Sequence, residues 1–408
     1  MKQRNAQSGV IFIAALILLA GMSVVIVALA NEVSLDLKMA TALIDADQAL
    51  ETAKVGIDKI IYAVNNDANW RTTYTSGTKY GPFPLGDGTF YVTIIDDDGN
   101  LADSPIDSVT VRSVATYKGT TRTVSATLTP PVHQAMMYLA AMWDSGRKIE
   151  TENGPRVYGD LMSNGNVSVI GALPDLRGDI YCRDPNKVDG RLIDADTAAI
   201  TISPTPTNPN PNIDWFIARG QPMSPPIVND KYEIADKVIS PTSNPYGFAS
   251  ANGIYYIQGG KQTRFVRCHI TATIVVKTGK EVWFDEASVH SPASPENPAL
   301  LSDQKIYYNF DRNLSEPQSG VDFNGDGDKT DVFTPFVSGL IHAADKFHGL
   351  QYSGGTNTVR FKGTIIAKEM ILIGRDCIFE QDPALSTNLV EQFQGTGMKL
   401  VKGSVKIE

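Results

Sequence analysis

The stretch of sequence that decides the fold is VIFIAALILLAGMSVVIVALA, residues 10–30, in which one glycine and one serine interrupt apolar side chains. As a helix that rises about 1.5 Å per residue, this run matches the ~30 Å hydrocarbon core of a bilayer. Lys2 and Arg4 precede the run, and the first acidic residue, Glu32, follows it. This asymmetry predicts a membrane-spanning helix whose N-terminus lies in the cytoplasm.

The helix is expected to continue beyond the apolar run, because no proline occurs before Pro82. An apolar stripe continues at alternating spacings of four and three residues, as Met39, Leu43, Ala46, Leu50, Ala53, Ile57, Ile60 and Val64. Charged residues fall off this stripe, which is typical of an amphipathic helix with one packing seam. The sequence therefore predicts one helix over residues 10–64, in which the small side chains of Ala46 and Ala53 allow close packing.

A short basic leader ending in Gly9, an apolar half-helix and an amphipathic half-helix together resemble the N-terminus of a type IV pilin. The run KMATALIDADQALETA, residues 38–53, is similar to the PilX-type minor pilins in particular. The resemblance implies that a prepilin peptidase cuts between Gly9 and Val10. Where pilins usually carry Glu at the fifth mature position, this chain has Ala14. The large K-type minor pseudopilin of type II secretion resembles the chain in lacking that Glu.

Two other interpretations of the N-terminus stay open on the sequence. A secretory signal peptide has a small-residue cleavage site after its apolar core, and Ala28-Leu29-Ala30 offers one. A plain single-pass anchor needs only the apolar run. The amphipathic continuation and the glycine that ends the leader favour the pilin interpretation.

Length and composition bound the rest of the chain. At 408 residues it is too long for one typical domain, so about two or three are expected after the helix. A net charge of −9, with no basic stripe, argues against a nucleic-acid partner. The cysteines Cys182, Cys268 and Cys377 lack the spacing of a zinc site. They are either three buried small side chains or include one pair that oxidises outside the cytoplasm.

Residues 65–130 predict a small antiparallel sheet that packs on the helix. A loop is expected over residues 65–88. Strands are expected over residues 89–95, 108–117 and 120–128, with Lys118-Gly119 as the two-residue hairpin between the last two. The acidic turn of Asp96, Asp97 and Asp98 is expected to be solvated, because such residues stabilise turns by themselves.

Residues 131–408 predict a large, mostly-β domain, so the fold class is α+β. Short β runs of similar shape recur over residues 159–171, 272–284, 339–349 and 363–374. Such imperfect self-similarity favours the stacked coils of a β-solenoid, and an irregular β-sandwich is the alternative. The region also resembles, more loosely, the C-terminal β-solenoid regions of large PilX-like proteins. A proline-rich excursion over residues 203–245, anchored by Trp215 and Phe216, is expected to cross the domain surface.

The stretch DFNGDGDKTD, residues 322–331, predicts a calcium site. Alternating oxygen-bearing side chains followed by a glycine match the first half of an EF-hand or dockerin loop. The expected ligands are Asp322, Asn324, Asp326, Asp328 and Asp331. Position 12 is Phe333 where an EF-hand has Glu, and no helical pattern flanks the loop, so a full EF-hand is excluded. A solvated acidic turn is the alternative to a Ca²⁺ cofactor.

No enzyme signature is found, and an enzyme is not expected. The histidines are scattered and are expected to pack or to lie on the surface: His133, His269, His290, His342 and His348. The adjacent Asp285 and Glu286 could serve a carbohydrate-active β-solenoid, but one acidic turn is weak support, and fold alone does not imply function.

The sequence thus predicts a structural subunit, a minor pilin or pseudopilin of a type IV pilus or related secretion filament. It would present a large extracellular β domain near the filament tip. Expected partners are other pilin subunits through the helix, the prepilin peptidase, and the inner membrane before assembly. The filament would lie at the cell surface or in the periplasm, where a surface glycan or protein is a candidate ligand. A membrane-anchored adhesin and a carbohydrate-active β-solenoid protein are the alternatives.

Overall fold

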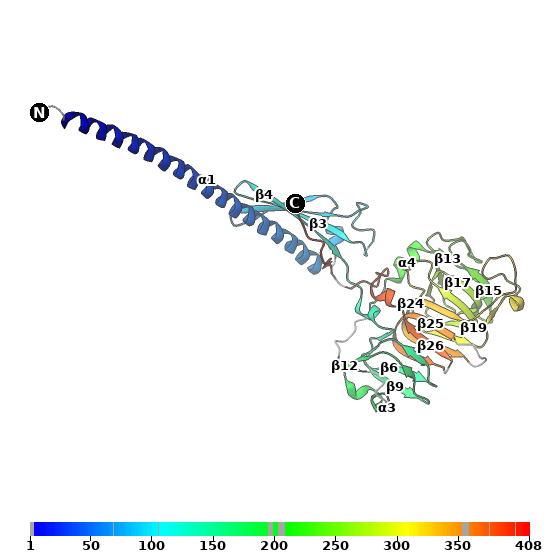
Figure 1. Cartoon of the computed structure of the whole chain (residues 1–408). Helices are drawn as coiled ribbons and strands as arrows, with labels where there is room; N and C mark the ends of the chain where they lie inside the picture. The colour runs from blue at the N-terminus through cyan, green and yellow to red at the C-terminus, as the bar shows by residue number, and fades with distance from the viewer. Residues whose placement is uncertain are drawn as a thin grey trace. The chain divides into compact units, whose positions relative to one another are not determined.

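The computed structural model describes two compact units, residues 1–129 with 397–408, and residues 130–396. Within them the structure describes residues 4–67, 69–104, 106–194, 199–202, 209–352, 359–374, 376–395 and 397–408. The chain consists of a long N-terminal helix, a small antiparallel sheet and a large mostly-β part, as the sequence predicts (Figure 1).

One continuous helix, α1 (Arg4–Asn66), dominates the first unit. Its second half packs on the sheet through a face of small and branched side chains, whereas its first half extends beyond the sheet (Figure 1). Past its end the chain makes a short second helix, α2 (Trp70–Thr73), and Trp70 is buried in the same core. The observed helix therefore includes the whole predicted range, residues 10–64.

The sheet of the first unit is antiparallel. Its strands are β1 (Lys79–Leu85), β2 (Gly88–Ile95), β3 (Val109–Tyr117), β4 (Thr120–Thr129), β27 (Lys399–Leu400) and β28 (Lys406–Ile407). Along β2, Phe90, Val92 and Ile94 alternate toward the helix and are buried. Lys118 and Gly119 form the predicted hairpin, with φ of 44° and 86°, as a type I′ turn requires.

Two expectations for this unit are wrong. The predicted loop over residues 65–88 contains the strand β1, which pairs with β2 only. Pro82 and Pro84 cannot donate to a ladder, and an edge strand tolerates them. In addition, residues 397–408 do not belong to the large β domain, because β27 and β28 pair with β4. The Asn65 side chain fixes this return by exchanging hydrogen bonds with the Met398 backbone.

Gly56 lies where α1 closely approaches Ser113 of β3. A Cβ atom added there would lie 2.1 Å from Ser113 Oγ and 3.0 Å from the Phe90 ring. Only hydrogen fits, so this glycine is required by packing.

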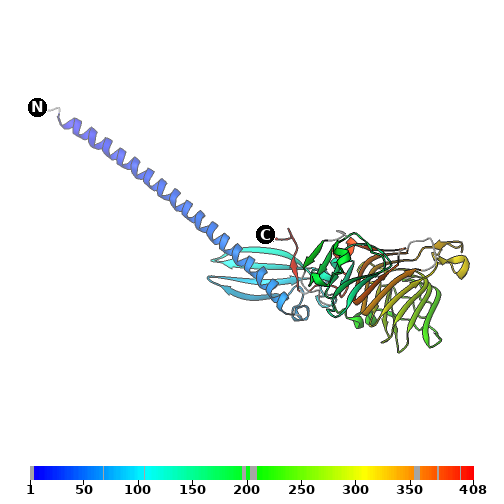
Figure 2. The ribbon, with the colours of Figure 1, turned by 90° about the horizontal axis from the view of Figure 1, so that it is seen from below.

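The second unit is built from parallel ladders in which successive chain segments stack side by side (Figure 2). One ladder contains β13 (Gln221–Pro222), β16 (Ile254–Gln258), β18 (Thr273–Lys277), β20 (Leu300–Ser302), β24 (Phe336–Tyr352), β25 (Val359–Ile373), β5 (Ala140–Met142), β8 (Leu161–Ser163), β11 (Ile180–Cys182) and β12 (Ile200–Ile202). A second contains β15 (Lys231–Ile239), β17 (Thr263–Thr271), β19 (Val282–Ser291), β21 (Ile306–Phe310), β24, β25, β6 (Lys148–Glu152) and β9 (Asn166–Ile170). A third continues from β24 and β25 to β26 (Cys377–Gln381), β7 (Arg156–Tyr158) and β10 (Asp175–Leu176).

The remaining elements are short. Two strands pair antiparallel with neighbours, β14 (Ile227–Val228) with β15, and β22 (Leu314–Ser315) with β23 (Val332–Phe333). The short helices are η1 (Gln134–Met137), η2 (Pro185–Lys187), α3 (Gly190–Asp194), α4 (Ile213–Arg219), α5 (Glu316–Ser319) and η3 (Pro383–Ser386).

Side chains at paired positions of neighbouring parallel strands stack in the core. Phe265 lies on Phe284 with ring centroids 4.7 Å apart, and Phe284 lies on Tyr308 at 4.5 Å. Gly339 and Gly363, 24 residues apart, occupy the same position on adjacent strands. Parallel stacking of this kind differs from the antiparallel pairing of a β-sandwich.

The strands of these ladders do not stack in chain order. The strand β5, which the chain reaches first, pairs with β25, which it reaches near the end. From β5 the chain proceeds to β12 at one end of its ladder and then begins again with β13 at the other end. The described strands of residues 140–202 therefore lie beside the late strands β25 and β26.

One further expectation needs correction. The proline-rich excursion was expected to run from 203 to 245, but β15 within it is a full member of the stack. Its residues 203–208 lie outside the described residues. Phe216 does anchor the segment and is fully buried. The segment that precedes this part of the stack is a single 3-10 turn, η1, followed by β5.

We expect Gly56→Ala to destabilise the first unit. Overpacking costs roughly 1–3 kcal/mol, which exceeds the gain in helix propensity of about 1 kcal/mol from replacing glycine by alanine. Thermal unfolding of the full chain in detergent measures the effect. Adding Ser113→Ala should recover part of the loss, because it removes the atom at 2.1 Å. Gly21→Ala, with no atom within 4 Å, is the control. Equal melting of Gly56→Ala and Gly21→Ala would contradict the close-packing account.

Candidate functional site

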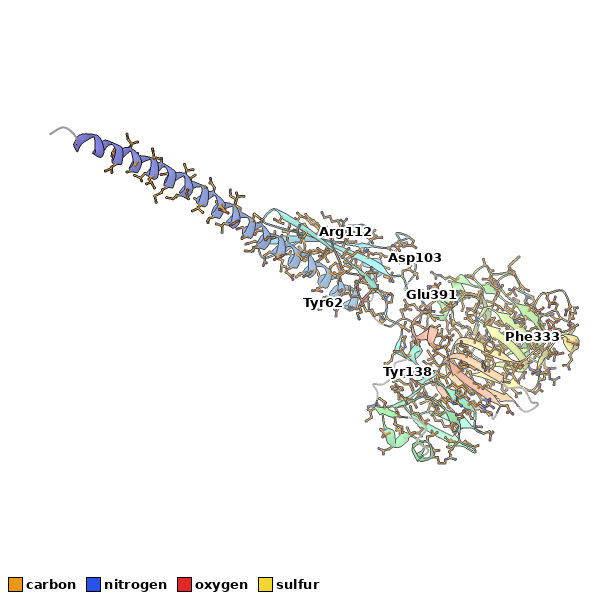
Figure 3. The ribbon with its side chains drawn as sticks, in the orientation of Figure 1. Tyr62, Asp103, Arg112, Tyr138, Phe333 and Glu391 are labelled. Carbon is orange, nitrogen blue, oxygen red and sulfur yellow. The ribbon has the colours of Figure 1, made fainter. Side chains whose placement is uncertain are left out.

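The first half of α1 presents a continuous apolar surface to its surroundings. In the described part of the chain, α1 is the one helix long and apolar enough to cross a membrane by length and composition. None of its most apolar stretch is buried within the described part of the chain. Side chains project from all sides of this half (Figure 3), and Ile11, Leu18 and Val24 are each more than half exposed.

The predicted packing seam divides at Ala46. Met39 and Leu43 are 61% and 68% exposed, so the sheet does not cover this part of the stripe. The later members pack against the sheet, with Leu50 partly and the others fully buried: Ala46, Leu50, Ala53, Ile57, Ile60 and Val64. Ala49 and Gly56 belong to the buried face as well. They lie off the heptad positions, and only their small size signals them in the sequence.

The predicted cleavage site, Gly9–Val10, lies within the backbone of α1, and its side chains lie outside the described residues. The helical backbone starts at Arg4, so the expected junction lies in the first turns of the helix.

The acidic loop over residues 322–331 lies in an insertion between β21 and β24. The ladder of β22 and β23 closes this insertion. Phe323, 2% exposed, attaches it to the stack, and its carbonyl lies 2.5 Å from His269 Nδ1. The loop therefore has a fixed base and an exposed acidic tip.

The five predicted ligands do not all meet at one point. The carboxylate of Asp322 accepts hydrogen bonds from the Gly325 and Gly327 N–H groups at 2.6 and 2.9 Å, and so shapes the turn. The Asn324 amide donates to Asp326 at 3.0 Å and to Asp331 at 2.7 Å. Asn324 Oδ1 in turn accepts the Asp326 N–H. Most of the loop's oxygens thus accept internal hydrogen bonds.

The closest group of acidic oxygens joins Asp328 and Asp331 to Glu316, which the sequence analysis missed. One carboxylate oxygen of each lies within 4.8 Å of those of the others. Glu316 is fully buried and accepts the Phe323 N–H at 2.6 Å and the Asp331 N–H at 3.2 Å. It precedes the loop in α5, so no local spacing could reveal it.

The electrostatics of this group favour a cation. Burial raises the pKa of Asp331, and the nearby carboxylates of Asp326, Glu316 and Asp328 raise it further, in that order. An added positive charge would relieve the same repulsion.

Asp285 and Glu286, the candidate residues for carbohydrate chemistry, both form ion pairs. Asp285 Oδ2 accepts a hydrogen bond from Arg264 Nε at 2.5 Å, and Glu286 pairs with Arg267. The carboxylate of Asp285 raises the pKa of Arg264, and that of Asp236 raises the pKa of Arg267. These ion pairs connect neighbouring strands and so help to hold the strands together.

The buried histidines and cysteines are packing residues. Burial lowers the pKa of His290 to about 4 and that of His342 to about 3, so both are neutral at pH 7. Cys182, Cys268 and Cys377 are all buried, and none forms a disulfide within the described part of the chain. Burial raises the pKa of Cys268 and Cys377 to about 12, which makes them poor nucleophiles.

A scan against protein-family models finds no match. A search of curated proteins finds none either. Among solved structures, the competence-associated pilin ComZ from Thermus thermophilus is similar to this chain, with 11% identity and a TM-score of 0.27. The alignment covers 89% of this chain and 98% of that chain. Because that TM-score is low, only the geometry of the chain itself can support a functional conclusion.

Proposed function

We propose that this protein is a structural subunit of a type IV pilus or related secretion filament, of the minor pilin or pseudopilin kind. The supporting observation is the division of α1 into an uncovered apolar half and a half that packs on an antiparallel sheet. A single-pass anchor needs no helical continuation into a folded head. In this proposal the apolar half lies in the inner membrane before assembly and among the helices of other subunits afterwards.

The proposed maturation follows the resemblance to PilX-type minor pilins. A prepilin peptidase removes the leader between Gly9 and Val10, and the N-terminus is cytoplasmic before assembly. The mature protein then belongs to a cell-surface or periplasmic filament. Ala14, where pilins usually carry Glu, favours a minor subunit over a repeating one.

We infer that the second unit is a β-solenoid that the filament displays near its tip. The parallel ladders and the in-register stacking of Gly339 on Gly363 support this assignment. Such a stack offers a long rigid surface for a glycan or protein ligand. The ion pairs of Asp285 and Glu286 favour a structural role over an enzymatic one. A membrane-anchored adhesin that does not polymerise is the second candidate.

We also propose that the insertion of residues 311–335 binds one Ca²⁺ ion. Glu316, Asp328 and Asp331 supply the closest oxygens, and Asp322, Asn324 and Asp326 complete a hard-oxygen environment that suits Ca²⁺. The ion would fix the tip of an insertion whose base is already attached through Phe323.

The assembly proposal predicts that Leu18→Lys blocks incorporation into a filament. Leu18 is 65% exposed on α1, and a charge at a helix centre in lipid costs about 2.5–3.5 kcal/mol on insertion scales. Shear and fractionation of native cells, with detection of the protein, measure filament incorporation. Leu18→Met is the matched control and should incorporate normally. Wild-type incorporation of Leu18→Lys would contradict assembly through α1.

The calcium proposal predicts that Asp331→Asn lowers the Ca²⁺ stoichiometry of the full chain by one. Metal that binds the folded state alone also raises the melting temperature by mass action, and this variant should lose that part of the rise. Equilibrium dialysis and thermal unfolding in detergent provide both measurements. The exposed Glu296 offers a control of equal charge change as Glu296→Gln. Unchanged stoichiometry in Asp331→Asn leaves the loop as a solvated acidic turn.

A further inference from the structure

The loop that joins β2 and β3 in the first unit contains a buried carboxylate. The sequence predicts a solvated turn at Asp96, Asp97 and Asp98, and this is wrong for the first of them. Asp97 and Asp98 are exposed, whereas Asp96 is only 5% exposed. Its backbone N–H donates to Ser76 Oγ at 3.0 Å, which fixes the start of the loop.

The buried carboxylate belongs to a cluster. One oxygen each from Asp96, Asp103 and Asp107 lies within 4.8 Å of those of the others. Asp103 is labelled in Figure 3. The Oδ2 atom of Asp96 is buried and accepts no hydrogen bond from any residue in the described part of the chain. Withdrawing a charged oxygen from water without a partner is costly, so this atom requires a proton or a cation.

Among the described residues, Arg71 places a positive charge near the cluster, but its guanidinium also binds backbone carbonyls. Arg71 donates from Nη1 to the Leu101 carbonyl at 3.1 Å and from Nη2 to the Asp107 carbonyl at 2.5 Å. Burial lowers the pKa of Arg71, although the carboxylates of Asp107, Asp96 and Asp103 oppose this shift. One guanidinium facing three carboxylates leaves an excess of negative charge.

The raised pKa of Asp96 reflects its burial and this excess of negative charge. Burial is the main cause that raises the pKa of Asp96, followed by the charges of Asp98 and Asp107. The folded state therefore disfavours the ionised form.

We propose that Asp96, Asp103 and Asp107 bind one divalent cation, preferentially Ca²⁺, in the first unit. Ca²⁺ takes oxygen ligands at about 2.3–2.6 Å, so two ligands on opposite sides of one ion lie about 4.6–5.2 Å apart. The three carboxylate oxygens lie within 4.8 Å of one another, which is close enough for one ion to contact all of them. The ion would join both ends of the β2–β3 loop beside the turn that carries Arg71.

This site is independent of the insertion at residues 311–335, and the experiment separates the two. The full chain in detergent carries Asp331→Asn as background, so that Ca²⁺ binding at the insertion is removed. Two variants are made in this background. Asp96→Asn removes the buried charge without changing the shape of the side chain, and Asp97→Asn makes the same change at the exposed neighbour. Equilibrium dialysis with Ca²⁺ and thermal unfolding, in Ca²⁺ and in chelator, are measured for all three proteins.

We expect the background protein and its Asp97→Asn variant to bind one Ca²⁺ and to melt at higher temperature with the metal. Asp96→Asn should abolish both effects and should melt above its parent in chelator, because an uncompensated buried charge is gone. That gain in chelator distinguishes loss of a ligand from loss of the fold. Retained Ca²⁺ binding in Asp96→Asn, or no binding in the background protein, would overturn the site. A lower melting temperature of Asp96→Asn in chelator would also contradict it.

Discussion

The uncovered apolar surface of α1 between Ile11 and Ile44 is the constraint on which this molecule depends. Each large apolar side chain left in water forgoes about 1.5–3 kcal/mol of burial free energy, and this half of the helix carries many of them. Within the described residues, no part of the first unit covers that surface. In the proposed function, lipid or the helices of other subunits cover it, whereas the second half of α1 is covered by its own sheet. The change occurs at Ala46, where small side chains begin to face the strands.

Contacts between neighbouring parallel strands stabilise the second unit. Phe265, Phe284 and Tyr308 stack on one another across neighbouring strands of one ladder, and Phe284 and Tyr308 also contact His290 and Phe310 of their own strands. The burial of these rings therefore depends largely on contacts between separate segments of the chain. The pairing of β5 with β25 joins an early strand of the unit to a late one, so this part of the stack forms only when both segments are present.

The sequence alone predicted the features that local pattern controls. The length of α1 follows from its apolar period, and the hairpin at Lys118 and Gly119 follows from turn chemistry. The strand β1 was missed because prolines conceal an edge strand. The order in which the strands stack could not be predicted either, because similar strands give no signal of which neighbours they pair with. The return of residues 397–408 to β4 is a long-range pairing of the same kind.

The candidate sites were predicted less well, for a related reason. Alternating acids located the loop of residues 322–331, but Glu316 joins it through tertiary contacts with backbone N–H groups. Gly56 has a packing role that depends on Ser113 in another element. Asp96 looks like any turn aspartate until the fold buries it. In each case the decisive property is an environment that distant residues create.

The central claim is that α1 enters a filament pathway as a processed pilin-type helix. N-terminal sequencing of the protein purified from native cells tests this most directly. The account predicts a first residue of Val10, because the basic leader stays in the cytoplasm and ends at Gly9. A native chain that starts at Met1 would contradict the account, since it would be an unprocessed anchor. A chain that starts after Ala30 would contradict it equally, since the apolar run would then be a signal peptide.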